Sequence, residues 1–194
     1  MLTALHALSG NLQEKHKLHI LTYNQPNWNV LFYDEIGSPI DYYSQFPEAT
    51  LEYYDEAYDL AVLSFKSENA YVALPISQKS PDYKEQIGTM SNPYNQSRNF
   101  ITTGYIISKK PISFGDDLTT GEYEVIKHSA KIAMGSSGSV LLNRDLEIIG
   151  INLGGGETIF GQFQHGLAMP SDKILDFLEG IENFQFSFLK NNVK

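Results

Sequence analysis

Short apolar or β-branched runs, separated by Gly, Pro, Asn and Asp, recur along most of this 194-residue chain. Runs of this length with turn residues between them are typical of antiparallel strands. The predicted strands cover residues 19–23, 28–33, 60–65, 71–74, 101–108, 122–126, 140–142 and 148–153. Their number and spacing predict an all-β protein built from antiparallel β-barrels.

One segment near the C-terminus has a helical pattern instead. Ile174, Leu175 and Leu178 form an apolar stripe within residues 171–181. Ser171 precedes this stripe and can cap the first turn, and Gly180 marks the end of the helix. The sequence therefore predicts a C-terminal α-helix over about residues 171–181.

Composition excludes several classes of partner and site. The net charge of −9 argues against nucleic acid, because phosphate binding requires clustered Lys and Arg, and Lys109 and Lys110 lie in an expected turn. The acidic stretch 48–59 does not have the spacing of a calcium loop and is expected to be a solvated surface loop. No pair of histidines has metal-ligand spacing, and the chain contains no cysteine. We expect no metal, no cofactor, no nucleic acid and no membrane segment.

Three short motifs carry candidate chemistry. The segment from Gly135 to Gly138 has the pattern Gly-x-Ser-Gly, in which a tight turn would aim the amides of Gly135 and Ser137 at one point and stabilise an oxyanion. Alone, such a pattern is also that of an ordinary turn. His6 follows Thr-Ala-Leu, and Asp59 precedes an apolar run, so the chain also supplies a candidate general base and a carboxylate to orient it. A surface histidine and a loop aspartate are the simpler alternatives for these two residues.

Together the three motifs resemble those of the trypsin-like serine proteases, which have the chymotrypsin fold. The order His, Asp, Ser along the chain is the chymotrypsin order and differs from the subtilisin and α/β-hydrolase orders. The stretches 88–108, 140–152 and 165–171 are similar to segments of the HtrA-like and glutamyl-endopeptidase-like bacterial branch. The resemblance covers about residues 1–180. It implies two antiparallel six-stranded-type β-barrels, the N-terminal one in residues 1–82 and the C-terminal one, with the terminal helix, in residues 83–194.

The resemblance also implies a reaction, in which Ser137 attacks a peptide bond of a polypeptide substrate, His6 acts as general base and Asp59 orients His6. It further implies an oxyanion hole formed by the amides of Gly135 and Ser137, and a substrate backbone that pairs with the strand edge at residues 152–154. The implied substrate-binding residues are Lys131, Ile132, Asn152, Leu153, Gly154, His165 and Gly166.

Two interpretations of this predicted pocket remain open. Lys131 and His165 are cationic candidates and would favour acidic side chains in the substrate. Alternatively, Lys131 extends into solvent, as long amines usually do, and His165 turns outward, which leaves a small apolar pocket.

The start of the chain departs from the family pattern. In double-barrel proteases about three strands precede the histidine motif, whereas here the motif begins at residue 3. We therefore expect an incomplete N-terminal barrel. A loosely held base loses the geometry that catalysis needs, so a catalytically impaired peptide-binding or protein-interaction module is the alternative to an active endopeptidase. The resemblance implies a secreted or periplasmic protein, and a cytoplasmic one if Met1 is the true start; the oligomeric state stays open.

Overall fold

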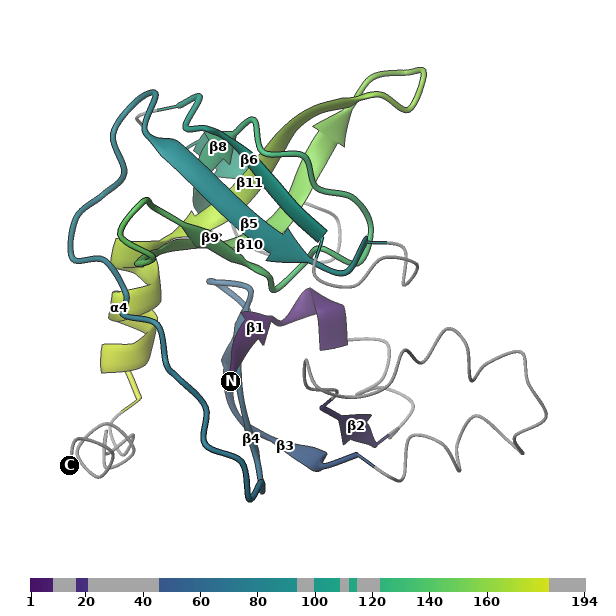
Figure 1. Cartoon of the computed structure of the whole chain (residues 1–194), viewed down its shortest axis with the longest axis vertical. Helices are drawn as coiled ribbons and strands as arrows, with labels where there is room; N and C mark the ends of the chain where they lie inside the picture. The colour runs from purple at the N-terminus through teal and green to yellow at the C-terminus, as the bar shows by residue number, and fades with distance from the viewer. Residues whose placement is uncertain (9–16, 21–45, 94–99, 109–111, 115–122, 182–194) are drawn as a thin grey trace.

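Two curled antiparallel sheets and a C-terminal helix form the part of the chain that the computed structural model describes, residues 1–8, 17–20, 46–93, 100–108, 112–114 and 123–181 (Figure 1). The first sheet has four strands in the order β1-β4-β3-β2, and the second has seven in the order β6-β5-β9-β10-β11-β8-β7. This arrangement confirms the predicted all-β, double-barrel class. The elements are β1 (Leu2–Ala4), β2 (Leu18–His19), β3 (Glu48–Asp55), β4 (Leu60–Phe65), β5 (Gln86–Ser91), β6 (Phe100–Tyr105), β7 (Ile112–Phe114), β8 (Tyr123–His128), β9 (Val140–Leu142), β10 (Ile148–Glu157), β11 (Phe163–Pro170) and α4 (Ser171–Glu179).

Strand β4 lies at the centre of the first sheet and is buried on both faces. Its side chains alternate between two hydrophobic clusters: Leu60 and Val62 face the second sheet, whereas Ala61 and Leu63 pack within the first sheet. A continuous apolar run is expected for a strand that is covered on both sides. Because β1 pairs with one edge of β4 and β3 with the other, β4 fixes the positions of both neighbours.

Two expectations about this half of the chain are wrong. Residues 48–55 are not a solvated loop but strand β3, in which Ala49 is buried and Glu48 and Glu52 are exposed. The acidic side chains share the solvated face of the strand, so their charge does not prevent pairing. Residues 71–74 are not a strand, and Val72 is 92% exposed, because this segment has no neighbouring strand among the described residues. The predicted strand at 28–33 lies outside the described residues.

The second sheet curls so that the chain just after β6 reaches β8. An isolated bridge joins Ile106, just after β6, to His128 at the end of β8, and the Ile107 amide donates to the Lys127 carbonyl at 2.8 Å. Strand β10 runs to Glu157, beyond its predicted end at residue 153. Its glycine-rich end has no side-chain alternation to reveal a strand, but its backbone pairs with β11. Strands β5 and β11 were not predicted either.

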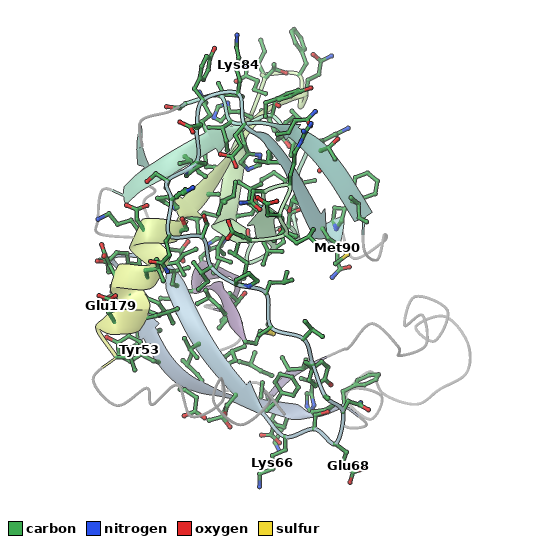
Figure 2. All side chains as sticks on the ribbon, turned by 60° about the vertical axis from the view of Figure 1, so that its left-hand side comes forward. Tyr53, Lys66, Glu68, Lys84, Met90 and Glu179 are labelled. Carbon is green, nitrogen blue, oxygen red and sulfur yellow. The ribbon has the colours of Figure 1, made fainter. Side chains whose placement is uncertain are left out.

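Helix α4 packs across both sheets and closes the core between them. Ile174 and Phe177 are buried in a cluster that also contains Leu60 from the first sheet and Ile151 from the second. The Phe177 ring lies 5.4 Å from that of Tyr53, and Figure 2 shows Tyr53 beside the end of α4 where Glu179 lies. The relative position of the two sheets is therefore held by apolar contacts.

The helix itself differs slightly from its prediction. It ends at Glu179, with Gly180 as its C-cap, and Pro170 occupies the N-cap without a side-chain hydrogen bond. Ser171 is instead a buried residue of the first turn. The buried stripe is made by Ile174 and Phe177, whereas Leu175 is only half-buried.

Candidate active site

His6, Asp59 and Ser137 come together at the boundary between the two sheets. The Nε2 atom of His6 lies 2.8 Å from Ser137 Oγ, and its Nδ1 atom lies 2.5 Å from Asp59 Oδ2. The Asp59 side chain is 5% exposed, whereas that of His6 is 32% exposed. The three side chains form one continuous hydrogen-bonded chain, with the carboxylate inside and the imidazole open to an incoming molecule.

Asp59 positions both the backbone and the ring of His6. It occupies the turn before β4 with a φ of 50°, a left-handed conformation that aspartate tolerates better than most residues. Its carbonyl accepts a hydrogen bond from the Leu5 amide at 2.9 Å, and Oδ1 accepts one from the His6 amide at 2.8 Å. Because Oδ2 accepts the proton of Nδ1, the Nε2 atom is left as an acceptor for the Ser137 hydroxyl.

Glycines shape the loop that carries Ser137. Gly135 and Gly138 have φ values of 91° and 80°, which favour glycine. A Cβ atom on Gly138 would lie 2.1 Å from Thr3 Oγ1, so the loop contacts strand β1 directly. Strand β1 leads into His6, and Figure 1 shows it next to the second sheet. This close approach brings the candidate nucleophile within reach of the candidate base.

The backbone of the same loop leaves two amides available. The Ser136 amide donates to the Ala133 carbonyl at 2.9 Å, and the Ser136 side chain is buried and donates to Ser91 Oγ at 3.1 Å. The amides of Gly135 and Ser137, in contrast, have no acceptor among the described residues. Two free amides beside a hydroxyl can stabilise negative charge that develops on a substrate oxygen.

A cavity of about 190 Å³ opens beside Ser137. Its wall has both apolar and polar surface, and Glu157 is the acidic side chain among the lining residues. The lining residues are Ile132, Ala133, Met134, Ser136, Ser137, Gly154, Gly155, Glu157 and Phe163. Of the predicted substrate-binding residues, Ile132 and Gly154 line this cavity.

The other predicted pocket residues do not line the cavity. The Lys131 side chain is exposed, and Leu153 is buried in the core between the sheets. Asn152 is fully buried and makes hydrogen bonds inside the second sheet. His165 lies over Gly156: a Cβ atom on that glycine would be 2.4 Å from the ring. Gly166 lies against the ring of His128 in the same way.

Sequence analysis did not identify Glu157 and Phe163, which face each other across the β10–β11 hairpin. Recognising β11 as a partner of β10 would have placed Phe163 opposite Glu157, which is on the same strand as Gly154. Burial, and secondarily Lys127, lower the pKa of His165, which disfavours a charged ring beside this hairpin.

Neither a metal cluster nor a membrane helix is found in the part of the chain that the structure describes. No group of three or more His, Asp or Glu side chains there is arranged to hold an ion. No described helix is both long enough and apolar enough to span a bilayer.

Comparisons with known proteins show a family match over most of the chain. A family model for the trypsin-like peptidase domain matches residues 1–151. The serine endoprotease DegS of Salmonella typhimurium is 33% identical over 141 residues, which cover 68% of this chain and 38% of DegS. The mitochondrial serine protease HTRA2 of Bos taurus is 30% identical over 133 residues, which cover 68% of this chain and 28% of HTRA2.

A solved structure shares the fold. The HtrA-type protease AlgW, in a structure with a decapeptide, has a TM-score of 0.68 at 21% identity, over 92% of this chain and 47% of AlgW. This chain therefore spans less than half the length of each of these three relatives.

Proposed function

Because the chain belongs to the trypsin-like peptidase family, we propose that it is a serine endopeptidase that uses Ser137, His6 and Asp59. The observation that carries this proposal is the hydrogen-bonded chain from Ser137 Oγ through the imidazole to the Asp59 carboxylate, with distances of 2.8 and 2.5 Å. A nucleophile within reach of a base, and a third group that orients the base, are the parts that acyl transfer requires.

The proposed reaction has two halves. His6 Nε2 takes the hydroxyl proton while Ser137 Oγ attacks the substrate carbonyl, and the amides of Gly135 and Ser137 hold the resulting oxyanion. His6 then gives the proton to the leaving amine as the peptide bond breaks. In the second half, water gives a proton to His6, attacks the acyl-enzyme and releases the second product, and Ser137 regains its proton.

The substrate we propose is an extended polypeptide that pairs with β10. Strand β9 pairs with β10 only as far as Ile151, so among the described residues no strand covers this edge of β10 from Gly154 onward. The backbone of Asn152 is already engaged with the nucleophile loop, because its carbonyl accepts from the Gly138 amide and its amide donates to Ser139. The Leu153 carbonyl in turn lies 3.2 Å from Ser137 Oγ, so the edge available to a peptide starts at Gly154 rather than at Asn152.

The cavity beside Ser137 is suited to an uncharged, apolar substrate side chain. Ile132, Met134 and Phe163 contribute apolar surface, and Glu157 is the charged residue of the lining. A carboxylate at this place disfavours an acidic side chain through like-charge repulsion. Since neither Lys131 nor His165 lines the cavity, we do not propose a preference for acidic residues.

Labelling with a fluorophosphonate probe tests the proposal. We expect the wild-type protein to be labelled at Ser137 and to cleave an unfolded protein such as casein. Ser137→Ala should abolish both signals. Ser129→Ala, which changes a serine that bonds to Tyr105 away from the site, should keep both. Folded wild-type protein that shows neither labelling nor cleavage would overturn the proposal.

A further inference from the structure

Buried polar side chains lie behind the nucleophile loop, in the second sheet. His128 and Asn152 are 0% exposed and Thr89 is 2% exposed, and they come from strands β8, β10 and β5. Polar groups buried to this degree destabilise a fold unless they are hydrogen-bonded. Their partners therefore indicate what the network holds in place.

The hydroxyl groups of Thr89 and Ser139 determine the direction of each hydrogen bond, because each has a single proton to donate. Thr89 Oγ1 donates to the Val140 carbonyl at 2.7 Å, and Ser139 Oγ donates to the Ser136 carbonyl at 2.6 Å. Both hydroxyls must then accept from Asn152, whose Nδ2 atom lies 2.8 Å from Thr89 Oγ1 and 2.9 Å from Ser139 Oγ. An amide nitrogen has two protons to donate, so these two bonds satisfy it.

The same reasoning fixes the proton on His128. With Nδ2 directed at the hydroxyls, Asn152 Oδ1 faces His128 Nε2 at 2.9 Å and accepts its proton. Nε2 therefore carries a proton, whereas Nδ1 is buried without a hydrogen-bond partner among the described residues that could accept a second one, so the ring is the neutral tautomer with its proton on Nε2. The hydrogen bonds then run in one direction, from His128 to Asn152, to Ser139 and to the carbonyl of Ser136.

The network ends on the peptide bond that precedes the candidate nucleophile. The Ser136 carbonyl accepts from Ser139 Oγ and also from the Ser139 amide, at 3.1 Å. This carbonyl and the Ser137 N–H belong to one planar peptide group and point in opposite directions. Fixing the carbonyl on one side therefore fixes the direction of the Ser137 N–H on the other.

We propose that His128, Asn152 and Ser139 are positioning residues that aim the Ser137 amide at the oxyanion of the reaction. The inference rests on the proposed function, since it assigns a role to an amide of that site. In this arrangement the seven-stranded sheet determines the orientation of an oxyanion donor from its interior, without contacting the substrate.

The series of hydrogen bonds from His128 through Asn152 and Ser139 to the Ser136 carbonyl is called the relay. Ser139→Ala is the variant that tests it. It removes the last donor but keeps the backbone bond to the Ser136 carbonyl. Complete loss of one oxyanion donor lowers kcat by about 10²–10³-fold, so we expect a drop of about 10- to 100-fold here. KM should stay within about twofold, because the oxyanion forms only after substrate has bound. Ser139→Thr keeps a hydroxyl and should recover most of the rate, and Ser129→Ala should match wild type.

Asn152→Asp provides a second measurement. A carboxylate cannot donate to Ser139 Oγ, so the hydroxyl would turn toward the carboxylate and away from the Ser136 carbonyl. We therefore expect a similar loss of kcat, and a double variant with Ser139→Ala that is no slower than the slower single variant. If Asn152→Asp fails to fold, the comparison of alanine and threonine at position 139 decides by itself.

The outcomes separate the relay from the proposed function. The relay is overturned if the wild type is active and Ser139→Ala has an unchanged kcat. It is also overturned if Ser139→Thr is as slow as Ser139→Ala. Neither result contradicts the proposed peptidase activity. Folded wild-type protein without labelling at Ser137 and without hydrolysis overturns both. The NMR spectrum of His128 tests its tautomer independently of activity, and a proton on Nδ1 would contradict the relay.

Discussion

Asp59, in the turn before β4, binds the amide and the ring of His6 with its two carboxylate oxygens and the Leu5 amide with its carbonyl, whereas in the seven-stranded sheet Ser137 is fixed by a loop with several anchors. Those anchors include two left-handed glycines, the contact of Gly138 with Thr3, and the hydrogen bonds to Asn152. Asp59 thus makes three hydrogen bonds to the segment that carries the base, whereas the nucleophile loop is anchored from several elements.

This contrast follows from how each sheet is covered. In the smaller sheet β4 is apolar on both faces, and polar anchoring is concentrated at the turn that ends β3. The larger sheet buries polar groups that come from different strands and form hydrogen bonds with one another. We therefore expect a single substitution at Asp59 to have a larger effect than a single substitution within the network behind Ser137.

The largest loss of kcat is expected from removing the base or the nucleophile, one of which follows β1 of the first sheet while the other lies in a loop of the second. His6→Ala and Ser137→Ala should each lower kcat by about 10⁶-fold, because nucleophile and base act as a unit. The double variant should be no slower than either single variant, as measured by hydrolysis of a chromogenic peptide. If the double variant instead showed the product of the two single losses in kcat, His6 and Ser137 would act independently. The two sheets would then not share one catalytic unit.

Asp59→Asn tests the dependence of the base on one side chain. The asparagine can still accept from the His6 amide, but it offers no second acceptor to Nδ1 and favours the wrong tautomer. We expect kcat to fall by about 10⁴-fold with little change in melting temperature. Asp55→Asn, at the end of β3 just before the same turn, changes a carboxylate that bonds to the Ala57 amide and serves as the control. Equal rates for the two variants would contradict the assignment.

His128 should give the second sheet a pH-dependent stability. Burial lowers the pKa of His128 from 6.5 to about 4, so the unfolded chain binds a proton that the folded protein resists. The free energy of unfolding should therefore fall as pH drops from about 6.5 to 4, by about 3 kcal/mol. Urea unfolding at several pH values can compare wild type with His128→Gln, which keeps a donor for Asn152. Parallel curves for the two proteins would show that His128 does not titrate in this way.

The smallest effect is expected for a change in the cavity wall, which should alter the choice between substrates. A Cβ atom on Gly154 would meet nothing within 4 Å, so Gly154→Val should narrow the cavity without disturbing the backbone. We expect the ratio of kcat/KM for substrates with Phe over Ala before the cleaved bond to fall by about 10-fold, the scale of one or two methylene contacts. Gly154→Ala should give a smaller change in the same direction. An unchanged ratio would show that this cavity does not receive that side chain.

Local patterns predicted the core strands and the three candidate triad residues. The runs that form β4 and the first part of β10 are apolar because both faces of these strands are covered, and the sequence shows this as continuous apolar residues. His6, Asp59 and Ser137 each occupy a short motif whose neighbours shape the local backbone. Strand β3 and the glycine-rich end of β10 were missed because neither is apolar, and their partners are distant in the sequence.

The sequence by itself determined which chemical groups this protein has and where its chain turns. Glycine at 135 and 138 allows the positive φ angles of the nucleophile loop whatever the rest of the fold does. Tertiary structure decided which side chains reach the cavity. The β10–β11 register shifts between Asn152 and Gly154, and such a bulge changes the face on which the following side chains lie. Asn152 therefore lies in the interior beside His128, whereas Glu157 and Phe163 line the cavity.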